Sequence, residues 1–331
     1  MPTKIGERIA SALLDRRIET PEVDALIETA KAEKKWTAEL KAEVVALLQT
    51  DTFASPADKA KLAAFVDTTP TVKDLADPTI LTKHAGTLEW NPVASGKLFV
   101  DGVSNDDVIQ GSIANCYMVA AFSSIAQADP KAIENAIKDN GDGTYDVRFF
   151  ESNGYGRPMK EVKVTVDGDM PMLAGASVGK YAKGRDKSEL WVGVLEKAYA
   201  QWKGGYEAVG NGGRSTEVFT VITGKSTSQS MTSYTPADQL FTSIQTATAA
   251  HKPVTAGTHG KDSGVDYNGT GVYAWHAYSV MGAVEEGGQK YVQLRNPWGS
   301  SEHGSDGKDD GMFKMKLEDF TKLYSNVSIG Q

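Results

Sequence analysis

The segment of residues 110–121 constrains this chain most, because it holds the only cysteine in the sequence. A Gly-Ser pair near its start is typical of a turn, and residues 117–126 are almost all apolar or small. Such a run predicts a helix that is buried on every side and begins near Cys116. The free backbone N–H groups at a helix N-terminus favour a thiolate, so this position suits a nucleophile. Taken alone, however, a lone cysteine in an apolar segment is more typical of an inert core residue.

Two later segments supply partners for such a nucleophile. Residues 275–281 form a β-branched and aromatic run with His276 near its start, and residues 294–299 end a strand at Asn296, before a proline. Singly, this histidine is typical of a structural side chain and this asparagine of a turn. Together the three residues follow the chain order cysteine, histidine, asparagine. This order matches thiol hydrolases in which the base is far from the nucleophile in sequence and close to it in space. The sequence therefore predicts a catalytic triad of Cys116, His276 and Asn296.

Several segments resemble, in the same order, the protease core of the calpain family. They are Gln110-Gly111, Leu190-Trp191 with Leu195–Ala200, His276–Val280 and Leu294–Gly299. The resemblance runs from about Leu98 to the C-terminus and implies an α+β, papain-like fold, with the cysteine in a helical half and the other triad residues in a β-rich half. The departures from the family pattern bear on substrate preference and rate more than on the chemistry. They are Asn115 in place of aspartate, Tyr117 in place of tryptophan and Trp275 in place of glycine.

The activity that the resemblance implies is that of an endopeptidase making limited cuts in protein substrates. Cys116 would attack the scissile carbonyl as a thiolate paired with a protonated His276, whose ring Asn296 would orient. The backbone N–H of Cys116 and the side-chain amide of Gln110 would stabilise the oxyanion, although a glutamine here is also typical of a helix cap. Two alternatives remain open: a catalytically weak or silent scaffold that binds proteins, and a thiol acyltransferase.

The resemblance also implies a calcium ion, and no organic cofactor is expected. In the family the helical half binds one ion through two backbone carbonyls and two carboxylates. The matching positions here are Val100, Gly102, Asp107 and Glu189. An ion there would fix the loop that leads to the cysteine; without one, the aspartate would be a helix cap and the glutamate a solvated charge.

A second calcium site would lie in the β-rich half. We expect one site rather than two, because the loop is short and Met312 replaces an acid of the family pattern. The candidate ligands of this second site are Glu302, Asp306 and Asp310.

Composition and charge exclude some classes of partner. The net charge is -8 and no basic stripe is present, which argues against a nucleic acid. No stretch is long enough to span a membrane. Charged residues interrupt every short apolar run near the N-terminus, so we expect no secretory signal, and a single cysteine forms no internal disulfide. These features favour the cytoplasm, while export by a non-classical route stays open.

The length of 331 residues suits two or three domains. Residues 1–67 have the spacing of three or four amphipathic helices and would form either a module that binds a regulator or a packing extension. Residues 68–97, rich in threonine, proline and aspartate, are expected to be a linker. The two protease subdomains are expected to cover residues 98–212 and 213–331, with adjacent glycines as a hinge between them.

Overall fold

The computed structural model describes residues 3–33, 35–69, 71–154, 157–304 and 307–331. The chain divides into two compact units, of which the first comprises Met1–Ala76 and Asp139–Thr144. The second comprises Asp77–Lys138 and Tyr145–Gln331, and it holds every residue expected to be catalytic.

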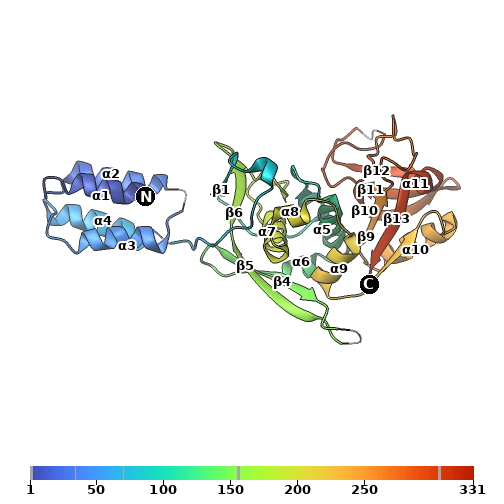
Figure 1. The fold of residues 1–331 in the computed structure, drawn as a ribbon, viewed down its shortest axis with the longest axis horizontal. Coiled ribbons are helices and arrows are strands. Elements are labelled where there is room, and N and C mark those ends of the chain that lie inside the picture. Colours follow the sequence, from blue (N-terminus) through green and yellow to red (C-terminus); the bar gives the residue numbers. More distant parts are fainter. Residues whose placement is uncertain (1–2, 34, 70, 155–156, 305–306) are drawn as a thin grey trace. The chain divides into compact units, whose positions relative to one another are not determined.

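The first unit contains four short helices in its described residues (Figure 1). These helices have a hydrophobic core of their own. They are α1 (Lys4–Ala12), α2 (Thr20–Ala32), α3 (Ala38–Leu48) and α4 (Pro56–Thr68). The side chains of Thr37 and Ser55 cap α3 and α4 by accepting hydrogen bonds from backbone N–H groups in the first turn. Apolar residues at helical spacing, such as Val23 and Leu26, are buried between the helices. The predicted amphipathic N-terminal helices are confirmed.

Part of residues 68–97, which we expected to be a linker, has regular structure. A short 3-10 turn, η1 (Thr82–His84), is followed by strand β1 (Leu88–Pro92), which pairs antiparallel with β6 (Asp169–Leu173). Pro92 does not prevent this pairing, because it occupies the last position of a strand in a two-stranded sheet. The second unit therefore begins before the segment that resembles a protease.

The helical half of the second unit is built around α5 (Cys116–Ala128), in which residues 117–126 are all buried, as the apolar run predicts. The other helices are α6 (Pro130–Glu134), α7 (Trp191–Lys203), α8 (Tyr206–Val209) and α9 (Ser215–Thr223), after a 3-10 turn η2 (Asn105–Asp107). The strands are β2 (Val108–Ile109) paired with β7 (Lys183–Gly184), and the sheet β3 (Ile137–Asp139), β4 (Thr144–Glu151) and β5 (Lys160–Asp167). One hydrophobic core joins these elements and extends to Ile222 on α9.

The β-rich half is a six-stranded antiparallel sheet in the order β12-β11-β10-β9-β13-β8. Its strands are β8 (Thr227–Met231), β9 (Val254–Thr258), β10 (Ala277–Glu286), β11 (Gln289–Arg295), β12 (Met312–Lys316) and β13 (Tyr324–Gly330). Helices α10 (Ala237–Ala249) and α11 (Leu317–Leu323) pack on it and close a second core. The two cores give the α+β, papain-like arrangement that the resemblance implies.

Two buried serines, one on helix α5 and one on strand β10, join this helix to the sheet. The Ser124 hydroxyl donates to the Val254 carbonyl at 2.8 Å, and the Val254 N–H donates back at 2.6 Å. The Ser279 hydroxyl donates to the Ala120 carbonyl at 2.8 Å. Because buried hydroxyls need partners, these serines fix how the cysteine helix meets strands that lie far along the chain.

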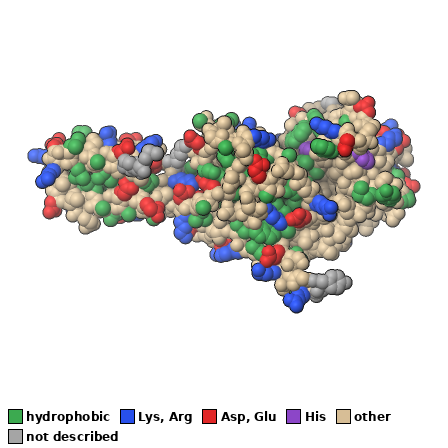
Figure 2. Space-filling view, in the orientation of Figure 1, with side chains coloured by type: hydrophobic (Ala, Val, Ile, Leu, Met, Phe, Trp, Pro, Cys, Tyr) green, Lys and Arg blue, Asp and Glu red, His purple; other side chains and the backbone are tan. Residues whose placement is uncertain are grey.

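The surface carries charges of both signs. On the face shown in Figure 2, lysines and arginines are interspersed with aspartates and glutamates, and the described residues form no continuous basic stripe there. Among the helices of the described ranges, none is both long and apolar enough to pass through a lipid bilayer.

Candidate active site

Two neighbouring strands bring His276 and Asn296 together. His276 directly precedes β10 and Asn296 directly follows β11, and the two strands pair antiparallel. The ring Nε2 lies 2.9 Å from the Asn296 Oδ1, and the Asn296 Nδ2 donates to the Ser301 carbonyl at 2.9 Å. Since the amide nitrogen is engaged elsewhere, the amide oxygen faces the ring, which places the ring hydrogen on Nε2. The Nδ1 of His276 is then the free base.

Aromatic side chains shield His276 from water. The ring centroids of Trp298 and Tyr278 lie 4.7 Å and 4.9 Å from that of His276, whose exposed fraction is 7%. Burial lowers the pKa of His276 to about 4, and the hydrogen bond with Asn296 opposes this shift only in part. The imidazole is therefore neutral at pH 7.

Helix α5 begins at Cys116, and the thiol and His276 line the same pocket, of about 340 Å³, which we call the cleft pocket. We expected the helix N-terminus to favour a thiolate. Burial instead raises the pKa of the Cys116 thiol, and the backbone N–H groups of Ala277 and Tyr117 offset this only partly. Burial therefore favours the neutral thiol in this arrangement, and the thiolate–imidazolium pair stays a prediction.

Gln110 is tied to both halves of the core. Its backbone N–H donates to the Pro297 carbonyl at 2.8 Å, just beyond Asn296, and its side-chain Nε2 donates to the Ile113 carbonyl at 2.8 Å. One amide hydrogen is thus committed within the loop rather than directed at a substrate. An amide nitrogen carries two hydrogens, so the second remains for an oxyanion.

A buried pair beside the nucleophile was not predicted from the sequence. Asn115 precedes Cys116, and its Nδ2 donates to the Glu196 Oε1 at 2.5 Å, while the Ala182 N–H donates to Oε2 at 3.0 Å. Both side chains are almost completely buried, and burial raises the pKa of Glu196 to about 7. The sequence did single out both positions. Asn115 departs from the family pattern, and Glu196 belongs to a segment that resembles the family.

Arg295, the residue before Asn296, also escaped the sequence interpretation. Its guanidinium is 0% exposed and donates to the Val108 carbonyl at 2.8 Å, on the strand that leads to Gln110. Burial lowers its pKa to about 10, which still leaves it charged at pH 7. This arginine therefore joins the asparagine strand to the loop ahead of the cysteine.

The residues expected to bind calcium in the helical half lie around Glu189. The Val100 N–H donates to the Glu189 Oε1 at 2.9 Å. Asp107 is indeed a cap, because its Oδ2 accepts from the Ser104 N–H at 2.7 Å, and it also accepts from the Trp191 Nε1 at 3.2 Å. Gly102 adopts a left-handed backbone conformation, with a φ of 95°.

Glu189 is buried, not the solvated charge that we considered as the alternative; its exposed fraction is 4%. Burial raises its pKa to about 7, and repulsion by Asp107, Asp186 and Asp101 adds to the shift. No lysine or arginine of the described ranges forms an ion pair with it. A hard cation would relieve this accumulation of negative charge, so the residue set fits calcium.

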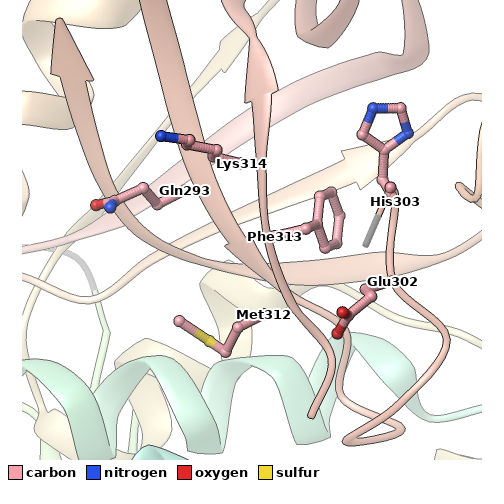
Figure 3. Close-up of a pocket in the computed structure, with 7 residues that line it drawn as sticks. Gln293, Glu302, His303, Met312, Phe313 and Lys314 are labelled. Carbon is pink, nitrogen blue, oxygen red and sulfur yellow. The ribbon is translucent and has the colours of Figure 1, made fainter. Parts of the chain in front are cut away.

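The candidate ligands of the second site are engaged within their loop. The Glu302 carboxylate accepts from the Gly311 N–H at 3.0 Å, and the Asp310 carboxylate accepts from the Met312 N–H at 3.0 Å. Glu302 lines a pocket of about 410 Å³ against β12 (Figure 3). Asp306 lies outside the described residues.

Comparison with known proteins points to one family. A family model described as "Calpain family cysteine protease" matches residues 81–307. The chain is 29% identical over 280 residues to "Calpain-2 catalytic subunit" of Rattus norvegicus, 30% over 280 residues to "Calpain-12" of Mus musculus and 27% over 286 residues to "Calpain-A" of Drosophila melanogaster. These matches cover 73%, 75% and 75% of this chain, which spans only 38%, 38% and 33% of the relatives' lengths.

Proposed function

Because the chain belongs to the calpain family of cysteine proteases, we propose that it is an endopeptidase that makes limited cuts in protein substrates. The observation that supports this most directly is the cleft pocket. The first residue of a buried helix, Cys116, lines this pocket together with His276, whose ring is hydrogen-bonded to Asn296. A nucleophile, a base and a residue that orients the base are the parts that covalent peptide hydrolysis requires.

The resting pair in this proposal is a neutral thiol and a neutral imidazole. His276 accepts the thiol proton as Cys116 attacks the scissile carbonyl, and the tetrahedral oxyanion is stabilised by the Cys116 N–H and the Gln110 amide. His276 then donates the proton to the leaving amine, which departs and leaves a thioester on the sulfur. Water, deprotonated by the same imidazole, hydrolyses the thioester and restores the thiol.

The test combines cleavage with labelling. The protein is incubated with casein, and in parallel with an epoxide inhibitor that alkylates reactive thiols, with and without calcium. Cleavage that is lost in Cys116→Ala, with labelling at Cys116, is the expected result. Labelling without cleavage would favour a thiol acyltransferase, and neither cleavage nor labelling would leave a protein-binding scaffold. Either result would refute the endopeptidase.

We further propose that calcium binds the helical half and strengthens the site. Val100 and Gly102 would supply backbone carbonyls, and Asp107 and Glu189 would supply carboxylates. The support is chemical, since the buried Glu189 has acidic neighbours and no basic partner among the described residues. When bound, the ion would supply structural rigidity only, by fixing the loop between this acidic cluster and Gln110.

Thermal unfolding tests the calcium proposal without any activity measurement. We expect calcium to raise the melting temperature of the wild type relative to chelator, and to raise it much less in Glu189→Gln. Glu302→Gln serves as the matched control, since only one site is expected. An unchanged melting temperature on adding calcium to the wild type would contradict the proposal.

A further inference from the structure

The cleft pocket has one wall from each half of the protease core. The helical half contributes Gly212, Gly213 and Arg214 beside the cysteine, and the β-rich half contributes side chains of β8, β9 and β13. None of the described residues that line it is an aspartate or a glutamate. The chain as a whole is acidic, with a net charge of -8, so this pocket differs in charge from the rest of the molecule.

The floor of the pocket is polar. The Gln229 Nε2 donates to the Asn326 Oδ1 at 3.2 Å and to the Ser328 hydroxyl at 3.1 Å. Gly257 lies under this network, and a Cβ there would come within 2.8 Å of the Asn326 Nδ2. Because Gly257 has no side chain, the Asn326 amide can lie over strand β9. An aliphatic substrate side chain would strip water from these groups without replacing its hydrogen bonds, which is unfavourable.

Arg214 supplies a positive charge at the rim. It is exposed, directly precedes α9, and forms no ion pair with a carboxylate among the described residues. The acidic residue one turn further along, Glu217, is paired with Lys203 at 2.8 Å. The guanidinium of Arg214 is therefore available as a planar donor for a carboxylate of another molecule.

Trp275 also lines the pocket, in a strained backbone conformation. Its φ is 55°, and its side chain is 67% exposed, directly before His276. A Cβ on Gly260 would come within 2.1 Å of the indole Nε1, so the ring lies on a position where only glycine fits. A left-handed conformation is unfavourable for a bulky residue, and exposing a large aromatic ring adds to this. Such a residue suits a contact with a ligand better than a structural role.

We propose that the cleft pocket selects an acidic side chain of the peptide substrate, with Arg214 binding its carboxylate and Trp275 covering its methylene groups. Arg214 is the donor for the carboxylate in this proposal, because both hydrogens of the Gln229 Nε2 are already donated to Asn326 and Ser328. This inference rests on the proposed peptidase function for the identity of its ligand, a peptide. It adds a substrate class that the Cys116, His276 and Asn296 arrangement does not specify.

Binding to the Cys116→Ala variant tests the selection apart from hydrolysis. The probes are capped hexapeptide libraries in which each position in turn is fixed as glutamate, glutamine, leucine or lysine. We expect glutamate to bind about tenfold more tightly than lysine at one position, the scale of one partly solvated charge-assisted contact. Adding Arg214→Glu is expected to reverse this order, whereas the matched control Arg157→Glu, an exposed arginine outside the pocket, keeps it. Equal affinities at every position would overturn the inference.

Trp275→Gly separates binding from stability, because glycine relieves the backbone strain. The expected result is an unchanged or raised melting temperature together with an affinity for the glutamate library at least fivefold weaker. A lowered melting temperature with unchanged affinity would overturn the role of Trp275 in binding. Hydrolysis of the preferred peptide by the wild type is measured separately. Acid-selective binding without hydrolysis or labelling of Cys116 would refute the proposed peptidase activity but support the acidic selectivity. Hydrolysis without acid selection would support the peptidase activity and refute the selectivity.

Discussion

Replacing Glu196 by glutamine is expected to remove a loss of stability that the wild type undergoes as the pH rises. The carboxylate accepts hydrogen bonds from Asn115 and from the Ala182 N–H in a fully buried site. A glutamine keeps both contacts if the Asn115 amide turns over. The oxygen of the glutamine then accepts from the Ala182 N–H, and the Nε2 of the glutamine donates to the Asn115 Oδ1. In the wild type this Oδ1 is buried and has no partner in the described structure. The variant should therefore fold.

The magnitude follows from the raised pKa of Glu196. Burial raises it from 4.5 to about 7, so between these values the folded protein holds a proton that the unfolded chain has released. Stability then falls as the pH rises through this window. A shift of this size corresponds to about 3 kcal/mol, lost in full above pH 7. Glutamine does not titrate and is free of this loss.

Urea unfolding in chelator at pH 4.5 and pH 8 measures the effect. The stability of Glu196→Gln relative to the wild type is expected to increase by about 3 kcal/mol between the two pH values. The control, Glu285→Gln on the exposed part of β10, should show no such change. A difference between Glu196→Gln and the wild type that is the same at both pH values would refute the assignment of a protonated carboxyl beside the nucleophile.

Other predictions concern the reaction and the N-terminal unit. Cys116→Ala and His276→Ala should abolish peptide hydrolysis at an unchanged melting temperature, and Asn296→Ala should retain a measurable fraction of kcat/KM, because orienting a ring contributes less than supplying the nucleophile. Wild-type turnover in Cys116→Ala would refute the triad. The acid limb of kcat/KM should lie near pH 4, because His276 must be neutral to accept a proton and burial lowers its pKa to about 4; a limb at pH 6.5 would contradict this. Removing residues 1–67 should leave peptide hydrolysis intact, because that unit has its own core; a folded truncation with no activity would count against this.

Much of the architecture follows from local patterns in the sequence. The apolar run after Cys116 predicts a fully buried helix, and α5 begins at that residue. The alternation before Asn296 predicts a strand that ends there, and β11 ends one residue earlier. The spacing of apolar residues and the order of the candidate residues can be read along the chain, so both can be identified without a structure. The catalytic roles of Cys116, His276, Asn296 and Gln110 stay predictions, although the structure places the first two in one pocket and hydrogen-bonds the third to the histidine.

Proline and threonine content was a less reliable guide. Residues 68–97 have the composition of a linker, yet β1 forms there because β6, about 80 residues later, supplies a partner strand. An edge strand depends on its partner for hydrogen bonds, and the partner is invisible in the local composition.

Burial and charge environment are what only the tertiary structure decided. A helix N-terminus by itself favours a thiolate at Cys116, but burial in the folded protein raises the pKa of the thiol. Glu189 and Glu196 look like ordinary charged residues in the sequence, and both are buried carboxyls with a pKa of about 7. The sequence by itself determined the buried helix after Cys116, the strand before Asn296 and the order Cys-His-Asn, because these depend on neighbours along the chain. Protonation states, the Asn115–Glu196 pair and the charge of the cleft pocket depend on groups brought together from distant segments, because desolvation and electrostatic interaction depend on distance in space.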